Sequence, residues 1–200
     1  MGSGDPVVLV LAGGRGERFR ASGGAMHKLD APLAGRSVLS RTLAAVAASG
    51  LPHRVVSPHP TRPGMGDSIA AGVRACADAP GWLVLPGDMP LVQPQTLQAV
   101  ARALADHAVV APHHRGCCGH PVGFQSVCGP DLMALSGDRG AASVRARWPC
   151  LNLSVDDEGV LLDIDTVDDL RAAERRWQQA ERRRQGGHGR GVGADGAEGP

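Results

Sequence analysis

Apolar runs and amphipathic stretches alternate along this chain of 200 residues. Short apolar runs bounded by glycine or proline, such as 7–11 (VVLVL) and 82–86 (WLVLP), are typical of strands buried on both faces. The same pattern predicts these strands along the chain: 7–11, 54–57, 82–86, 108–112, 121–125, 150–155 and 160–164.

Between the strands, apolar residues recur at three- and four-residue spacing, which predicts helices. Ser37 is a suitable N-cap for the first helix, and Gly50 ends it. The second helix begins at Asp67 or Ser68, and Pro94 opens the third. Each of these helices has one apolar face that can pack against a sheet.

The C-terminal third of the chain has further helix signals. Two short helices are expected at 130–136 and 139–147. Thr166 and Asp169 form a capping-box pattern, which opens a last helix that runs through Trp177.

Repeated alternation of strands and helices predicts an α/β fold with a mostly parallel central sheet flanked by helices. We expect one domain at 7–180. Residues 1–6 and 181–200 have almost nothing apolar to bury, so we expect a disordered N-terminus and a disordered tail. In such sheets, ligands bind outside the carboxyl ends of the strands, so the residues that follow each strand are the first to consider.

The charges nearly balance, with 21 Lys and Arg against 20 Asp and Glu. Residues 171–200 carry a net charge of +3, which leaves −2 on residues 1–170. A body with negative net charge, three Trp, two Phe and no Tyr argues against nucleic acid as a partner.

Other composition signals concern location and redox state. The chain has no apolar run of about 18 residues that could span a membrane, and its N-terminus lacks the basic region of a signal peptide. We therefore expect a cytoplasmic protein. The five cysteines include no CxxC pair, which indicates reduced thiols. A metal site at Cys117, Cys118 and His120 is the less favoured alternative.

A glycine-rich turn follows the first strand, at 11–19 (LAGGRGERF). Gly13, Gly14 and Gly16 let the backbone turn tightly and point N–H groups at an anion. Phe19 stands where a dinucleotide fingerprint needs its third glycine, and the pattern of a Walker loop is absent. The segment fits either a phosphate site or a structural turn.

Lys28 is the single lysine in a chain with 20 arginines. It lies just downstream of the glycine-rich turn. A compact ammonium suits phosphate coordination, which favours a functional role over a lysine exposed by chance.

Carboxylates follow two of the expected strands. Asp88 comes after strand 82–86 and could hold Mg²⁺ against a nucleotide's phosphates, or it could cap a turn. Asp163 and Asp165 end strand 160–164, where alternation puts both on the same side. One of them could instead support the cap at Thr166.

Two more loops are rich in glycine, 64–72 (GMGDSIAAG) and 119–124 (GHPVGF). The first lies at a helix N-terminus and is a second candidate for contacting an anion or a base. In the second, His120 could contact substrate or transfer a proton, although a single loop histidine is more often solvated or capping.

In this order, the motifs resemble the molybdenum-cofactor nucleotidyltransferases. The motifs are 11–19, Lys28-Leu29, 64–72, PGDMPLV (86–92), 119–124, GDRGA (137–141) and DIDTVDDL (163–170). The resemblance implies a Rossmann-like nucleotidyltransferase fold and Mg²⁺-dependent transfer of CMP from CTP to the phosphate of molybdopterin, with release of pyrophosphate. A molybdenum enzyme is an expected client.

The resemblance also assigns roles to residues. The catalytic residues would be Arg18, Lys28 and Asp88. The nucleotide-binding residues would be Leu11, Ala12, Gly13, Gly14, Arg15, Gly16, Lys28, Gly64, Met65, Gly66, Asp67 and Ser68. The metal ligands would be Asp88, Asp163 and Asp165, and the pterin side would hold His120, Asp163 and Asp165.

Two departures from the family pattern leave alternatives open. Gly13-Gly14 resembles the guanylyl branch, which uses GTP, whereas four other motifs resemble the cytidylyl branch. Residues 51–63 have room for one short strand, so we expect a fold that is one strand-helix unit shorter than usual relatives. The competing hypotheses are a guanylyltransferase, a non-catalytic protein for cofactor maturation, and a nucleotidyltransferase for another phosphorylated metabolite.

Overall fold

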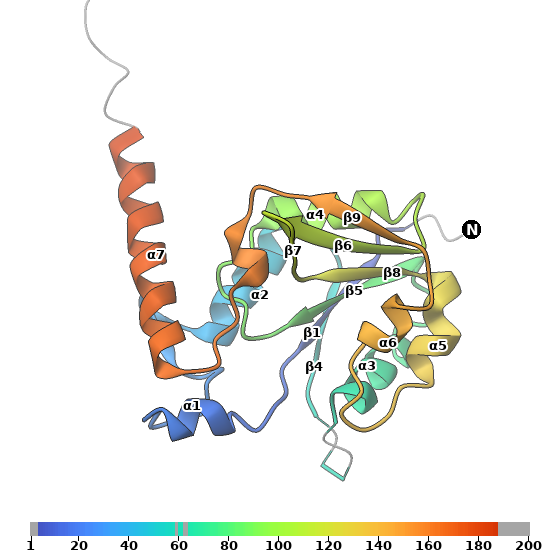
Figure 1. The fold of residues 1–200 in the computed structure, drawn as a ribbon, viewed down its shortest axis with the longest axis horizontal. Coiled ribbons are helices and arrows are strands. Elements are labelled where there is room, and N and C mark those ends of the chain that lie inside the picture. Colours follow the sequence, from blue (N-terminus) through green and yellow to red (C-terminus); the bar gives the residue numbers. More distant parts are fainter. Residues whose placement is uncertain (1–3, 59, 62–63, 188–200) are drawn as a thin grey trace, which may run out of the picture.

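The computed structural model describes residues 4–58, 60–61 and 64–187 and contains a central seven-stranded sheet (Figure 1). The strands follow the order β4-β1-β5-β8-β6-β7, and β9 pairs with the other edge of β6. Their bounds are β1 Val7–Leu11, β4 His53–Val56, β5 Gly81–Pro86, β6 Val109–His114, β7 Cys117–Cys118, β8 Val122–Gln125 and β9 Cys150–Ser154. A separate small hairpin pairs β2 (Pro32–Leu33) with β3 (Arg36–Ser37).

The expected α/β fold with a mostly parallel sheet is confirmed. Strands β4, β1, β5, β6 and β9 run in one direction, because β8 is antiparallel to both β5 and β6. Strands β7 and β8 both pair with the same edge of β6, at His113–His114 and Val109–Val110. They therefore occupy one position in the sheet, as a single strand interrupted by a break at 119–121.

Helices cover both faces of the sheet (Figure 1). Helices α3 (Met65–Arg74), α5 (Gly129–Met133) and α6 (Ala142–Arg145) pack on one face around Trp82 and Phe124. Helices α2 (Val38–Ala48) and α4 (Pro94–Ala103) pack on the other. A third cluster joins α1 (Glu17–Ala21), the small hairpin and α7 (Val167–Gly187). No helix in the described part of the chain is long and apolar enough to cross a membrane.

Most helix starts agree with the sequence. The Ser37 side chain accepts a hydrogen bond from the Ser40 N–H at the start of α2, and Pro94 begins α4. Helix α3 begins slightly earlier than expected, at Met65. Residues 51–63, where one short strand was expected, contribute β4 at the sheet edge.

The last helix is longer than expected. Thr166 and Asp169 form the predicted capping box, in which each side chain accepts a hydrogen bond from the other's backbone N–H. The helix then continues past Trp177 to Gly187, so 181–187 are helical. Residues 1–3 and 188–200 of the expected disordered ends lie outside the described residues.

The prediction of a strand at 160–164 is wrong. A 3₁₀ helix, η2 (Glu158–Leu161), occupies its start, and residues 162–165 are irregular. Gly159 packs against the segment that leads into α4. A Cβ added at Gly159 would lie 2.1 Å from the Leu91 carbonyl oxygen. The apolar run therefore reports burial, with Val160 and Ile164 almost fully inaccessible, rather than strand pairing.

Asp157 holds this segment in place. Its Oδ2 accepts hydrogen bonds from the Gln93 N–H at 2.9 Å and the Thr96 hydroxyl at 2.7 Å. Its Oδ1 accepts from the Gly159 N–H at 2.9 Å. The carboxylate is 2% exposed, so it depends on these donors in place of water.

We expect Asp157→Asn to lower the free energy of unfolding by about 2–3 kcal/mol, because an amide loses the charge that all three donors face. Urea unfolding measures the change. The control is Asp156→Asn at the exposed neighbouring position, which should stay within about 0.5 kcal/mol of wild type. Equal effects of the two substitutions would contradict the role given to Asp157.

Candidate active site

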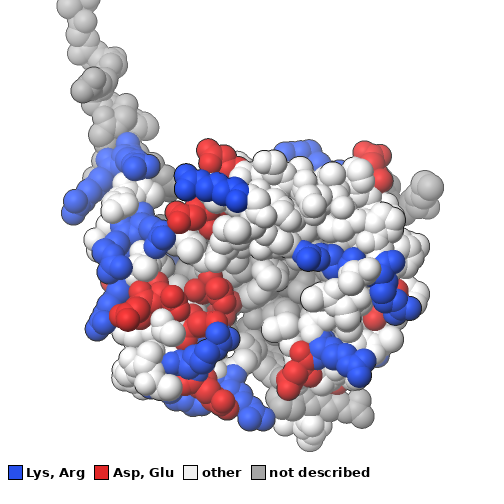
Figure 2. All heavy atoms as spheres, in the orientation of Figure 1, with Lys and Arg blue, Asp and Glu red and all other residues white. Residues whose placement is uncertain are grey.

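A cavity of about 980 Å³ opens at the carboxyl ends of β1 and β5. Figure 2 shows a central hollow on this face, with acidic and basic side chains gathered beside it. The glycine-rich turn, the start of α3, the end of β5, the break between β7 and β8, and α6 contribute to its walls. The predicted site residues that line it are Leu11, Gly13, Gly14, Arg15, Gly16, Arg18, Lys28, Met65, Ser68, Asp88, His120, Asp163 and Asp165.

The backbone of the glycine-rich turn adopts a conformation that would be strained for residues other than glycine. Gly14 and Gly16 adopt φ angles of +109° and +60°, in the left-handed region that favours glycine. The Gly14 carbonyl oxygen lies 2.8 Å from His27 Nε2, which ties the turn to the segment that carries Lys28. The turn therefore presents its backbone to the cavity with little side-chain bulk.

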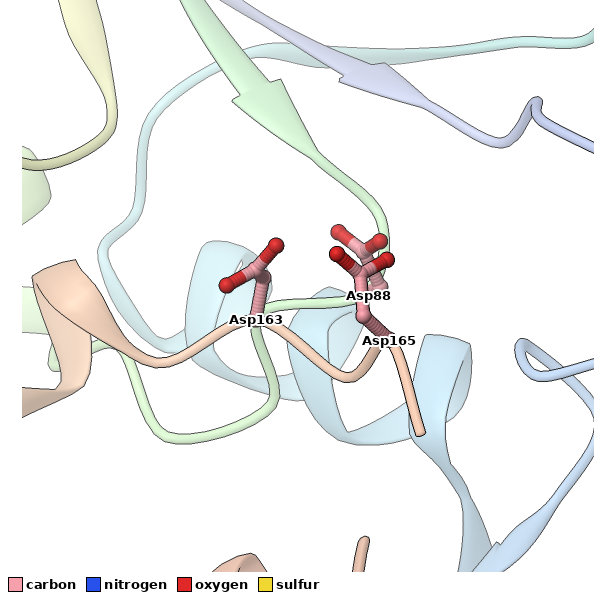
Figure 3. A group of neighbouring side chains, drawn as sticks. All are labelled: Asp88, Asp163 and Asp165. Carbon is pink, nitrogen blue, oxygen red and sulfur yellow. The ribbon is translucent and has the colours of Figure 1, made fainter. Parts of the chain in front are cut away.

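Three carboxylates meet on the cavity floor. One oxygen from each of Asp88, Asp163 and Asp165 lies within 4.8 Å of the others. Figure 3 shows the three side chains pointing to the same side of two neighbouring segments. The Ile164 N–H donates to the Asp88 carbonyl oxygen at 3.0 Å, which fixes the two segments together although no strand forms there.

Lys28 offsets part of the negative charge of this cluster. Its Nζ lies 2.5 Å from Asp88 Oδ2 and 2.8 Å from Asp165 Oδ1, and it is 9% exposed. Arg18 approaches the second Asp165 oxygen at 2.6 Å. Two cations therefore face three carboxylates, which leaves one excess negative charge.

The pKa values reflect this arrangement. Burial alone would lower the pKa of Lys28, but the charge of Asp88 and the hydrogen bonds to both carboxylates raise it on balance. Burial opposes ionisation of Asp165, yet the hydrogen bond and charge of Lys28, helped by Arg18, lower its pKa. Burial and the charge of Asp165 raise the pKa of Asp163.

The carboxylate cluster fits a divalent cation. Asp88 Oδ1 is buried and has no hydrogen-bond donor among the described residues. A buried carboxylate oxygen without a donor is costly unless a cation reaches it. Carboxylate oxygens are the ligands that Mg²⁺ and similar ions prefer, so Asp88, Asp163 and Asp165 are suitable ligands.

His120 lies in the break between β7 and β8. The backbone N–H of His120 donates to the Val160 carbonyl oxygen at 2.9 Å, which connects the break to η2. Burial lowers the pKa of its imidazole, and the opposing charge of Asp88 does not offset this. This shift favours the neutral form of the imidazole.

The predicted GMGDS segment divides into two groups. Met65 and Ser68 line the cavity. The Gly66 N–H donates to the Gly137 carbonyl oxygen, and Asp67 Oδ2 accepts from the Gly137 N–H, both at 2.8 Å. The residues of this segment that pack against 137–140 instead of lining the cavity are Gly64, Gly66 and Asp67. Their glycine pattern thus serves a close backbone contact.

Ala12 is the last of the predicted site residues. Its N–H donates to the Val56 carbonyl oxygen, and it also lies outside the cavity lining. The site roles assigned from the sequence omitted several residues that do line it. These are Glu17, Phe19, Ile69, Val84, Pro86, Cys118, Gly119, Val122, Phe124, Asp138, Gly140, Ala141, Ala142 and Arg145. Most of them belong to the motifs that the sequence analysis singled out, whereas Val84, Ala142 and Arg145 lie outside those motifs.

Substitution of Lys28 tests the charge balance. We expect Lys28→Met to lower the free energy of unfolding by about 3 kcal/mol in EDTA, because two nearly buried carboxylates lose their shared cation. Added Mg²⁺ should stabilise this variant more than wild type, since a divalent cation can replace the ammonium. Urea unfolding with EDTA and with Mg²⁺ measures both effects.

The matched control is Arg36→Met, which removes an exposed positive charge away from the cavity. It should change the free energy of unfolding by less than about 0.5 kcal/mol. A Lys28→Met variant that behaves like this control would contradict the bridging role.

Known proteins resemble this chain in sequence or in fold. PucB, a purine catabolism protein of Bacillus subtilis (strain 168), is 27% identical over 196 residues, which cover 82% of this chain and 93% of PucB. Rv0371c from Mycobacterium tuberculosis H37Rv has a crystal structure that matches with a TM-score of 0.72 at 25% identity, over 88% of this chain and 100% of that chain. A manganese complex of Rv0371c matches with a TM-score of 0.66 at 23% identity, over 86% of this chain and 98% of that chain.

A molybdopterin-guanine dinucleotide biosynthesis protein A from Archaeoglobus fulgidus shares the fold, with a TM-score of 0.64 at 21% identity over 86% of this chain and 99% of that chain. Residues 8–151 match the MobA-like NTP transferase domain. Since this match covers more than half of the sequence, the chain belongs to the MobA-like NTP transferase family of nucleotidyltransferases.

Proposed function

We propose that this protein is a Mg²⁺-dependent cytidylyltransferase that joins CMP from CTP to the phosphate of molybdopterin and releases pyrophosphate. One observation carries the proposal: a single cavity combines a glycine-rich turn, the cations Lys28 and Arg18, and a carboxylate cluster whose Asp88 oxygen lacks a donor among the described residues. These are the groups that a reaction between two phosphate-bearing substrates needs.

The glycine-rich turn and the two cations would bind the triphosphate. Backbone N–H groups of residues 13–16 offer donors to phosphate oxygens without side-chain bulk. The Lys28 ammonium is compact and lies beside Asp88, so it can contact both the cluster and a phosphate. Arg18 pairs with Asp165, but its side chain is 77% exposed, so it can also turn toward the triphosphate.

Asp88, Asp163 and Asp165 would hold the cation. The manganese complex of Rv0371c supports use of a divalent ion, and Mg²⁺ is our proposal for the ion. When bound, Mg²⁺ supplies positive charge that offsets the charge of the phosphate oxygens.

The reaction needs no covalent intermediate with the protein. An oxygen of the molybdopterin phosphate attacks the α-phosphorus of CTP, and the bond from that phosphorus to the β-phosphate's bridging oxygen breaks. The electron pair of this bond leaves with pyrophosphate, and the product has a new P–O–P linkage. The attacking oxygen is already deprotonated, so the protein's tasks are positioning and charge stabilisation.

The choice of molybdopterin as acceptor and of cytosine as the nucleobase rests on similarity to known proteins and their motifs. The family match supports nucleotidyl transfer, and the fold shared with the molybdopterin-guanine dinucleotide biosynthesis protein A of Archaeoglobus fulgidus is consistent with molybdopterin as the acceptor. Four motifs favour CTP, whereas Gly13-Gly14 in the turn favours GTP. We therefore keep guanylyl transfer as the second candidate. A cytoplasmic location and a molybdenum-enzyme client complete the proposal.

The test is pyrophosphate release from CTP with molybdopterin and Mg²⁺, at catalytic amounts of protein. We expect multiple turnovers, loss of activity in EDTA, and a fall of roughly 100-fold or more in kcat/KM for Asp88→Asn. The control Asp106→Asn, on the exposed surface after α4, should retain wild-type rates. Turnover with GTP alone would overturn the base assignment, and no multiple turnover with either nucleotide would overturn the transferase proposal.

A further inference from the structure

The cavity has a second basic corner, formed by Arg145 at the end of α6. Arg145 is partly buried, and its guanidinium contacts the Cys118 thiol. Within the described residues it has no carboxylate partner. The other two arginines that line the cavity do have one, because Arg15 pairs with Glu17 and Arg18 pairs with Asp165. A guanidinium in a cavity without an anionic partner is suited to bind an anionic ligand.

The sheet order places the carboxylate cluster between this corner and the glycine-rich turn. The glycine-rich turn follows β1, Asp88 follows β5, and Cys118 precedes β8, with β5 between β1 and β8. Strand β8 is antiparallel to β5, and Val122 at its start pairs with Val84 near the end of β5. The Cys118 side of the cavity therefore adjoins the cluster from the direction opposite to the turn.

The cavity lining near Arg145 is partly apolar. It includes Val84 and Val122, which pair across β5 and β8 and are 5% and 8% exposed. His120 lies at the same end, and the charge of Arg145 adds to burial in lowering the pKa of its imidazole. An imidazole at this place can hydrogen-bond to a ligand while Arg145 supplies the positive charge.

Two anionic substrates also need two separate sets of cations. Lys28 and Arg18 lie on the carboxylate cluster and the triphosphate side. A second phosphate placed beside the triphosphate is repelled unless its own cation holds it. Arg15 belongs to the glycine-rich turn and pairs with Glu17, so among the described residues Arg145 is the cavity-lining cation that lies outside the triphosphate side.

We propose that Arg145 binds the phosphate monoester of the acceptor substrate and sets its position for attack, with the rest of the acceptor lying along Val84 and Val122. This inference rests on the proposed function, because it assigns the second substrate of that reaction to one corner of the cavity. Arg145 thereby determines specificity for a phosphorylated acceptor.

The first test compares Arg145→Gln with Arg147→Gln. Arg147 is two residues further on, is 68% exposed at its side chain, and pairs with Asp131 outside the cavity. We expect Arg145→Gln to raise the KM for molybdopterin at least tenfold and to leave the KM for CTP within twofold. Arg145→Lys should recover part of the loss, because it restores the charge without the guanidinium's two-pronged geometry. Arg147→Gln should match wild type.

A second readout does not depend on turnover. Because Cys118 contacts Arg145, molybdopterin bound at this corner should slow alkylation of the Cys118 thiol by iodoacetamide, followed by mass spectrometry. The ratio of rates without and with molybdopterin should exceed threefold in wild type and Arg147→Gln, and fall to about one in Arg145→Gln. Taking the ratio within each variant cancels any change in the thiol's own reactivity.

The two readouts separate the inference from the proposed function. If wild type turns over and Arg145→Gln keeps its KM for molybdopterin, or raises only the KM for CTP, the role of Arg145 is overturned and the transferase proposal stands. If wild type releases no pyrophosphate but molybdopterin protects Cys118 and Arg145→Gln abolishes the protection, the binding role stands and the transferase proposal is overturned. Absence of protection in wild type overturns the binding role.

Discussion

The bridge from Lys28 to Asp88 and Asp165 is the interaction on which the site depends. It joins three segments that are far apart in the sequence: the stretch after the glycine-rich turn, the end of β5 and the residues before α7. Three carboxylates within 4.8 Å would repel one another strongly without it. Because the ammonium is almost fully enclosed, its attraction is weakly screened, and the geometry of the cluster is set before any ligand binds.

The segment that supplies Asp163 and Asp165 is supported at both of its ends. Asp157 binds it to the start of α4, and the Thr166–Asp169 capping box fixes the point where α7 begins. Between them, the Ile164 side chain is buried in the cluster below α7 while its N–H bonds to Asp88. An irregular segment can hold two functional side chains firmly because packing and polar contacts replace the hydrogen bonds of a strand.

The sequence predicted those parts of the structure that local physics determines. Runs such as 7–11 and 82–86 are strands, and the Ser37 and Thr166 caps start helices, because their signals act over a few neighbouring residues. The conformation at 158–165 depends on Asp157 and the distant Gln93, which no local pattern contains. For the same reason the contact of Gly66 with Gly137 was not predicted, and Arg145 was missed because its partner Cys118 belongs to another element.

The antiparallel strand β8 explains how one sheet edge can serve two substrates. In a wholly parallel sheet, the loop entering the strand beside β5 lies at the opposite edge from Asp88. Since β8 runs against β5, its entry at 119–121 lies next to the end of β5 instead. The glycine-rich turn and the β7–β8 break thus flank the carboxylate cluster from two sides. In the reaction we propose, this topology would give each anionic substrate its own approach and its own cation, while both reach the same group of carboxylates.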